Sequence, residues 1–261
     1  MRAPRLRHLL ALALGATLLL ACFAQAEIER KNHLQVSVQG SLSPRTLPRN
    51  GTSPVSVSLS SKISSTNGRQ PPQLRQILIA INRHGRLDYA GLPACHESDI
   101  QPASSAAALS KCGDSLVGRG TFRAAVALPD QTPFPQSGEL LAFNGVRKGR
   151  HVIFAHIYGT DPLPQSSLIV FQIGRASGTF GTTLKADLPR VAANWGYISG
   201  ISMTLSRRYR YRGEPHSYLS AGCPAPQGTK VAPFPLSRSV FSFAGGTTIA
   251  LTLVRSCRAR G

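Results

Sequence analysis

Three arginines near the end of a long alternating stretch are the residues best suited to bind a ligand. From Ile201 to Arg212, apolar or aromatic residues alternate with polar ones, which predicts one strand with a buried and an exposed face. Arg208, Arg210 and Arg212 are expected to project from the exposed face about 7 Å apart. Guanidinium groups bind phosphate and carboxylate in a bidentate manner, so this spacing suits an extended polyanion. The alternative is a solvated face without a partner.

One residue interrupts this pattern. Arg207 shares the parity of the apolar residues, so the strand either leaves the core there or contains a bulge that shifts the phase. Tyr209 and Tyr211 are expected to face away from the three arginines, toward the core or a domain boundary.

No complete catalytic motif accompanies this stretch. Ser199 lies in Gly196-Tyr-Ile-Ser199-Gly200, which lacks the spacing that places a nucleophilic serine on a strand-to-helix turn. Asp88 and Glu97 offer an acid and a base of the kind that glycosidases use, but no motif frames them. The sequence therefore favours a protein without catalytic activity, and a hydrolase with an unrecognised site is the alternative.

Metal-ligating residues are sparse. His151 and His156 are five residues apart on a predicted strand, so their side chains point to opposite faces. His96, Glu97 and Asp99 lie in a predicted loop and offer oxygen ligands for a hard cation, but acids in a loop are more often simply solvated. We expect neither a metal nor another cofactor.

The N-terminal residues predict export. Three arginines among the first seven residues precede an apolar segment from Leu9 to Leu20, and Ala24-Gln25-Ala26 offers a cleavage site. Residues 1–26 are therefore expected to be a signal peptide and Glu27 the first mature residue. Alternatively, Leu19-Leu20-Ala21-Cys22 resembles a lipobox, in which Cys22 would carry a lipid. Both interpretations place the protein outside the cytoplasm, either secreted or attached to the cell envelope.

The chain is strongly basic. It has 30 Lys and Arg against 11 Asp and Glu, a net charge of +19. Without Arg2, Arg5 and Arg7, the remaining 27 cations still give a net charge of +16. A basic exported protein is attracted to phospholipid headgroups, wall polymers and acidic polysaccharides, and to nucleic acid only non-specifically. The alternative is a charge that serves solubility alone.

Four cysteines follow the predicted signal peptide, and an even number in an exported protein indicates disulfides. Three connectivities are possible. The simplest pairs Cys95 with Cys112 and Cys223 with Cys257. The spacing of these residues matches no zinc site.

Short alternating segments predict an all-β fold. The predicted strands include Leu34–Val38, Val55–Leu59, Ile77–Ile81, Phe122–Leu128, Leu140–Phe143, His151–Tyr158, Ser167–Ile173 and Ile249–Leu253. Asn144-Gly145 is expected to separate two of them as a turn. Ser167–Ile173 is almost continuously apolar, so we expect it to be buried on both faces. About a dozen strands with Gly- and Pro-rich turns favour antiparallel, immunoglobulin-like β-sandwiches.

One short helix is expected within the first cysteine pair. Ala103–Cys112 contains three consecutive alanines, with Ser104 or Ser105 as N-cap and Gly113 at the C′ position.

The mature chain is long enough for two domains. Gly40–Arg49 aligns with Gly181–Arg190 without a gap and with four identities in ten, which indicates an internal duplication. Pro162 and Pro164 provide a linker signal between the halves. We therefore expect two β-sandwich domains, residues 27–163 and 164–261, each with one cysteine pair.

The cysteine-containing segments are Gly91-Leu-Pro-Ala-Cys95, Cys112-Gly-Asp-Ser-Leu-Val117-Gly118-Arg-Gly120, Cys223-Pro-Ala-Pro and the closing Cys257. In this combination the chain resembles a group of exported, actinobacterial-type proteins with no assigned activity. The resemblance spans most of the mature chain, but it rests on structural motifs. It implies a secreted β-rich protein and supplies no catalytic residue.

The functional expectation is a non-catalytic envelope or extracellular module that binds an anionic polymer or membrane surface, mainly through Arg208, Arg210 and Arg212. A structural or adhesive protein that meets another protein through sheet edges is the second hypothesis. The sequence leaves the oligomeric state open.

Overall fold

The computed structural model describes residues 26–126, 132–160, 164–190 and 196–260, and these residues form the expected all-β fold. Where apolar and polar residues alternate in the sequence, buried and more exposed positions alternate along the strand. In β2 (Leu34–Ser43), Leu34, Val36 and Val38 are buried, while the residues between them are partly exposed.

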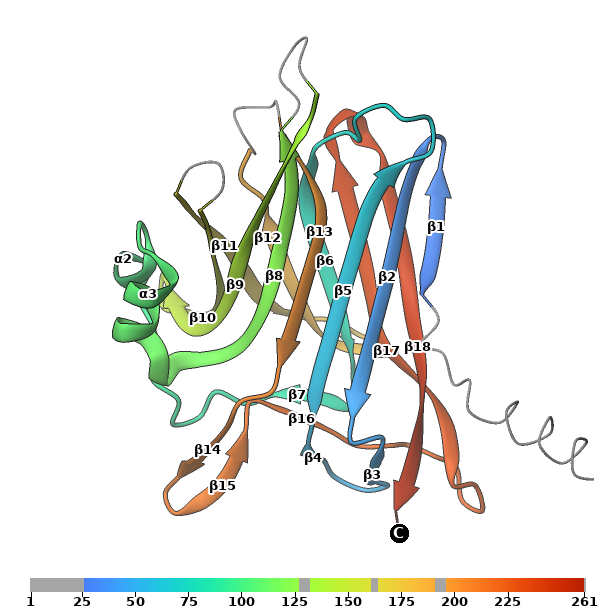
Figure 1. Cartoon of the computed structure of the whole chain (residues 1–261). Coiled ribbons are helices and arrows are strands. Elements are labelled where there is room, and N and C mark those ends of the chain that lie inside the picture. The colour runs from blue at the N-terminus through green and yellow to red at the C-terminus, as the bar shows by residue number, and fades with distance from the viewer. Residues whose placement is uncertain (1–25, 127–131, 161–163, 191–195, 261) are drawn as a thin grey trace, which may run out of the picture.

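Thirteen strands of the described residues form one large sheet (Figure 1). From edge to edge they are β1 (Glu27–Lys31), β2, β5 (Ser56–Ser65), β13 (Gly196–Leu205), β8 (Leu116–Val126), β9 (Phe134–Arg147), β10 (Arg150–Gly159), β11 (Gln165–Arg175), β12 (Phe180–Asp187), β6 (Leu74–Asn82), β17 (Val231–Phe243), β18 (Thr248–Arg260) and β3 (Thr46–Pro48). Neighbouring strands are antiparallel except β18 and β3, which are parallel.

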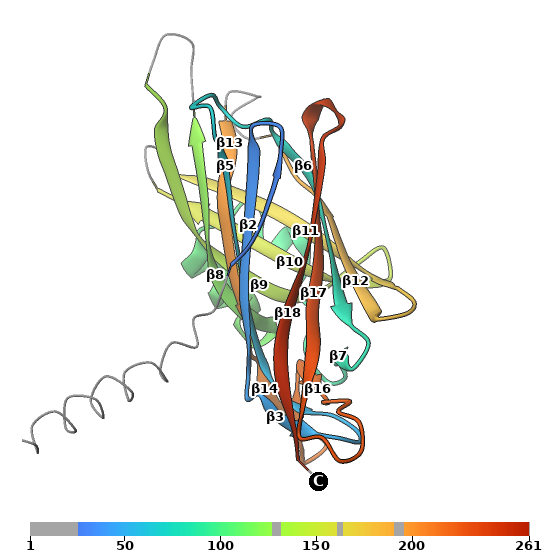
Figure 2. The same ribbon diagram turned by 90° about the vertical axis from the view of Figure 1, so that its right-hand side faces the viewer.

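The sheet curls until its two edge regions meet. β18 lies against both β1 and β2, which belong to the opposite edge (Figure 2). Arg255 on β18 donates a hydrogen bond from Nε to the carbonyl oxygen of Gly40 on β2, at 2.8 Å. Its Nη1 is also 4.0 Å from a carboxylate oxygen of Glu27 on β1. The inward side chains of the whole sheet therefore share one interior.

Two groups of buried side chains fill this interior. The first, here called the upper core, contains Phe122 and Phe241. The second, the lower core, contains Phe234 and Tyr218, and burial raises the pKa of the Tyr218 hydroxyl well above its ordinary value.

Short strands extend the fold beyond the lower core. β4 (Ser53–Pro54), β16 (Leu219–Ala221) and β7 (Gly85–Leu87) form a three-stranded sheet, and β14 (Arg208–Tyr211) pairs with β15 (Glu214–Ser217) in a hairpin. Figure 1 shows these elements together at the lower end of the molecule, near β3 and the end of β18.

Helical segments cover the outer face of β9 and β10. They are α2 (Glu97–Ile100), α3 (Ser105–Cys112) and the 3-10 turn η1 (Gly113–Ser115), and a further 3-10 turn, η3 (Ala244–Gly246), joins β17 to β18. As expected, Ser104 caps α3, because its Oγ accepts a hydrogen bond from the amide of Ala107. Gly113 does not adopt the expected left-handed conformation, since the chain continues helically into η1.

Both disulfides have the expected local connectivity, Cys95 with Cys112 and Cys223 with Cys257. The first joins the segment just before α2 to the last residue of α3. The second joins the loop after β16 to β18.

The expected division into two immunoglobulin-like sandwich domains is not seen. A boundary between residues 163 and 164 falls between β10 and β11, which pair along eight residue positions. β13, from the second half of the chain, also pairs with β5 and β8 from the first half. The two aligned segments differ in structure as well: Gly181–Arg190 contains most of β12, whereas Gly40–Arg49 includes the end of β2 and all of β3.

Two local expectations were wrong. β9 continues through Asn144 and Gly145, and the chain turns later, at Lys148-Gly149, where both φ values are positive. Asn144 is accommodated because its amide nitrogen donates to the Pro93 carbonyl oxygen at 3.0 Å. β11 is not buried on both faces, since Ile169 is its one fully buried residue.

Candidate anion-binding end of the molecule

The predicted strand from Ile201 to Arg212 is two strands. β13 ends at Leu205 and β14 begins at Arg208, so the chain leaves the large sheet at the position that the parity of Arg207 indicated. Arg208 and Arg210 are exposed and alternate with two tyrosines, as expected. Arg212 has a φ of 54° and lies in the hairpin turn, so the three arginines do not share one strand face.

The tyrosine face of the hairpin packs against residues 88–91. Tyr209 donates a hydrogen bond from its hydroxyl to the Ala90 carbonyl oxygen at 2.8 Å, and its ring stacks on His216. Burial, together with the charge of Asp88, raises the pKa of Tyr209 to about 12. Asp88 also lies 3.2 Å from Nδ1 of His216. These contacts hold the hairpin in place and turn its arginine face outward.

Backbone hydrogen bonds bring distant basic segments to the same end. The amide of Arg258 donates to the carbonyl oxygen of Arg45 at 2.8 Å, and the amide of Arg49 donates to that of Arg260 at 3.3 Å. β3 and the end of β18 therefore present their cations side by side.

The three-stranded sheet connects these cations to the hairpin. Arg86 on β7 pairs with Ser220 on β16, and the amide of Gly222 donates to the carbonyl oxygen of His84 at 3.0 Å. Burial, and to a smaller extent the charge of Arg83, lowers the pKa of His84. β16 in turn follows the hairpin directly in the chain.

We call this assembly the basic end. It consists of residues 45–54, 83–88, 206–230 and 256–260, and its Lys and Arg residues are Arg45, Arg49, Arg83, Arg86, Arg207, Arg208, Arg210, Arg212, Lys230, Arg258 and Arg260. Asp88 and Glu214 are its carboxylates. Among the described residues, ion pairs are formed by Arg119, Arg147, His216 and Arg255, and none involves a Lys or Arg of the basic end.

Some of these cations have structural roles. The guanidinium of Arg49 donates to the carbonyl oxygens of Ala225, Pro226 and Thr229, which fixes the loop that precedes β17. Arg210 donates to the Gly213 carbonyl oxygen at 3.2 Å within its own hairpin. Carbonyl oxygens do not neutralise a guanidinium, so the positive charge of both side chains remains.

Of these cations, only Arg208, Arg210 and Arg212 were expected from the sequence as ligand contacts, because that expectation rested on a single strand. A different signal was present: residues 30–87 and 215–261 contain no Asp or Glu. Both segments contribute to the basic end, so the lack of acids indicates where many of its cations come from, while the fold determines which of them lie together.

The structure brings one serine and one histidine together elsewhere. Nε2 of the fully buried His156 lies 3.0 Å from the Ala103 carbonyl oxygen and 3.3 Å from Oγ of Ser166. Because a carbonyl oxygen only accepts, Nε2 carries the proton and cannot take one from the serine. Burial lowers the pKa of His156, partly offset by the Ala103 carbonyl and Glu139. The pair therefore has no activated nucleophile.

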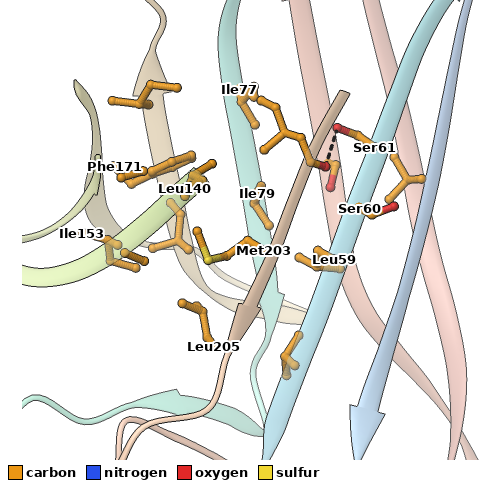
Figure 3. Close-up of a pocket in the computed structure, with 18 of the residues that line it drawn as sticks. Leu59, Ser60, Ser61, Ile77, Ile79, Leu140, Ile153, Phe171, Met203 and Leu205 are labelled. Carbon is orange, nitrogen blue, oxygen red and sulfur yellow. Dashed lines mark hydrogen bonds between the residues drawn. The ribbon is translucent and has the colours of Figure 1, made fainter. Parts of the chain in front are cut away.

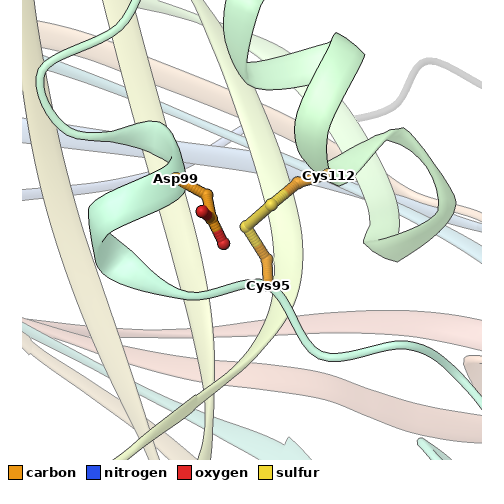
Figure 4. Close-up of side chains that lie close together, drawn as sticks. All are labelled: Cys95, Asp99 and Cys112. Atoms are coloured by element: carbon orange, nitrogen blue, oxygen red, sulfur yellow. A yellow bond between two sulfur atoms is a disulfide. The ribbon is translucent and has the colours of Figure 1, made fainter.

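The acidic residues near the first disulfide do not assemble a metal site. Asp99 points toward Cys95 and Cys112, but these sulfurs are bonded to each other (Figure 4). A disulfide offers no thiolate to a metal. Glu97 belongs to α2 instead of a loop and pairs with Arg147 at 3.2 Å.

The remaining catalytic candidates from the sequence do not form a common site. Asp88 contacts His216, while Glu97 contacts Arg147, so these two carboxylates serve different partners. Ser199 lies within β13, not at a strand-to-helix turn. Cys22 and most of the predicted signal peptide lie outside the described residues.

Comparisons of the chain with protein-family models, curated proteins and solved structures found no match. Within the described ranges, no helix has the length and apolar character needed to cross a membrane.

Proposed function

We propose that this protein is an exported, non-catalytic module that binds an anionic polymer of the cell envelope or extracellular space through its basic end. The observation that carries the proposal is the concentration of cations from four separate chain segments at one end, with Asp88 and Glu214 as its carboxylates. Asp88 already has a cationic partner in His216 when that histidine is protonated.

The chemistry favours a ligand with repeated phosphate or carboxylate groups. Nearly all of these cations are arginines, which bind such groups through two parallel hydrogen bonds. Several exposed arginines on neighbouring elements suit a chain that contacts them in succession. The two disulfides are compatible with an oxidising, extracellular location.

The sheet-edge hypothesis of adhesion has less support. β18 lies against both β1 and β2, so the two edge regions of the large sheet partly cover each other. Self-association that depends on protein concentration would favour that alternative.

The test measures the affinity of the mature protein for long-chain polyphosphate and for polygalacturonate over a salt series. Replacing Arg45, Arg258 and Arg260 with Ser, or Arg208, Arg210 and Arg212 with Ser, should weaken binding to at least one polymer. Each lost phosphate contact should reduce the slope of log affinity against log salt concentration by about one.

A matched control removes the same charge from the opposite end. Arg30→Ser, Lys31→Ser and Arg69→Ser together should retain the wild-type salt slope. Equal losses of affinity in all three triple variants would show that the polymers respond to net charge alone. That result would overturn specific binding through the basic end. Binding to anionic lipid vesicles but to neither polymer would assign this end to a membrane surface instead.

A further inference from the structure

The two cores do not meet completely. A cavity of about 110 Å³ lies between them, inside the curled sheet. Ile79, Phe171 and Met203 are partly buried and pack against both the upper and the lower core. Figure 3 shows these three side chains around the same space, with Leu59 and Leu140.

The wall of the cavity is almost entirely apolar. Its hydroxyl-bearing residues are Ser60, Ser61 and Ser239, and no charged residue lines it. Ser61 already donates to the Ile201 carbonyl oxygen, at 3.5 Å. Buried water needs two to four polar partners, so this space is better suited to an apolar occupant.

Small residues on one wall leave the space open. Ala142 on β9 and Ala155 on β10 lie directly opposite each other in the strand pairing, and both line the cavity. On the facing side, Leu59 pairs with Met203. A thioether side chain is flexible and polarizable, so Met203 can adjust to an occupant.

We infer that the interior of the curled sheet binds a linear hydrocarbon chain, such as the end of a lipid tail. The cavity is smaller than the roughly 150 Å³ that accepts benzene in an apolar protein core, which favours a thin chain over a ring. The inference is independent of the basic end, since no residue of that end lines the cavity.

The test uses a reporter in the wall itself. Met203 and Met1 are the two methionines of the chain, so methionine labelled at its methyl carbon gives a resolved NMR signal from the cavity. The probes are xenon and the linear alcohols from butanol to octanol. Saturable shifts of the Met203 methyl signal are expected. The dissociation constant should fall about fourfold for each added methylene until the cavity is filled, and then level off.

Two variants fill the cavity and one serves as a control. Ala142→Leu, or the smaller change Ala155→Val if the first variant does not fold, should weaken binding of the alcohols at least tenfold. Ala250→Leu adds the same side chain at an exposed position of β18 and should leave the affinity unchanged. The inference is overturned if wild-type protein shows no saturable shift, or if a folded filling variant binds as tightly as wild type.

Discussion

Arg255 on β18 and Gly40 on β2 link the two edge regions of the large sheet through a hydrogen bond of 2.8 Å from Nε to the carbonyl oxygen. Gly40 permits the approach, because a Cβ at this position would lie 2.7 Å from Cδ2 of Leu253 on β18. The side chain of Arg255 is only 11% exposed, so its guanidinium is largely shielded from competing water.

Replacing Arg255 with Met should therefore destabilise the protein and loosen the contact of β18 with β1 and β2. A hydrogen bond that involves a charged group contributes roughly 1.5–3 kcal/mol, so we expect a loss of that order in the free energy of unfolding. Urea denaturation measures the loss, and hydrogen exchange locates it. Amides of β1 and the adjoining part of β2 should exchange faster, whereas Arg238→Met, at an exposed position on β17, should change neither quantity. Unaltered exchange in β1 and β2 would refute this role.

Gly91 is a second close approach, and its substitution should detach the hairpin that carries Arg208 and Arg210. Its φ is +75°, and a Cβ would lie 2.1 Å from the ring of Tyr211. Gly91→Ala therefore combines backbone strain with displacement of the tyrosine. We expect a larger loss of stability than the approximately 1–2 kcal/mol typical of a left-handed non-glycine residue.

Gly149→Ala separates these two causes. Gly149 has a similar φ of +72°, and a Cβ there meets nothing within 4 Å. Urea denaturation of both variants should show that Gly91→Ala lowers the free energy of unfolding more than Gly149→Ala does. The excess should disappear when Gly91→Ala is combined with Tyr211→Ala and compared with Tyr211→Ala alone. Equal losses for the two glycine variants would show that the contact with Tyr211 contributes nothing.

Strands were predictable because burial in a curled sheet follows local alternation. Val36 and Val38 face the interior, and the sequence pattern alone indicates this. The Ser104 cap and the position of α3 were predictable for the same reason, since each depends on neighbours within one helical turn. The local disulfides were the simplest of three connectivities and proved to be the observed ones.

Features that depend on distant partners were not predictable in this way. Asn144 would ordinarily favour a turn, but its amide nitrogen donates a hydrogen bond to the Pro93 carbonyl oxygen, 51 residues away, from within a strand. The hairpin from Arg208 to Ser217 continues the alternation of β13, so periodicity could not show that the chain leaves the sheet. The basic end likewise depends on hydrogen bonds such as that from Arg258 to Arg45.

The two disulfides should contribute unequally to stability. Cys95–Cys112 spans 17 residues and Cys223–Cys257 spans 34. On loop entropy alone, we expect losses of about 3 and about 4 kcal/mol when each pair is replaced with alanine. Urea denaturation tests this ranking. Proteolysis should cleave the α2–α3 segment first in the former variant and the loop before β17 in the latter, and cleavage at the same site in both would contradict these local roles.

His156 should make the protein less stable in mild acid. Its neutral ring donates from Nε2 to the Ala103 carbonyl oxygen, and its Nδ1 is buried without a partner, so protonation would place an unpaired charge beneath the helical segment. The folded-state pKa is therefore lowered, mainly by burial. Because the unfolded chain then binds the proton more readily, stability falls as pH decreases below about 6.5 and levels off below the folded-state pKa.

Glutamine at position 156 provides the test, since its amide can still donate to the Ala103 carbonyl oxygen but does not titrate. Urea midpoints measured from pH 7.5 to 5.0 should fall less in His156→Gln than in the wild type. His84→Gln is the comparison, because the pKa of His84 is also lowered but its side chain is partly exposed, whereas His156 is fully buried, so the effect should be smaller. If His156→Gln retains the full pH dependence of the wild type, the acid sensitivity arises elsewhere, and the buried imidazole is accommodated in both protonation states.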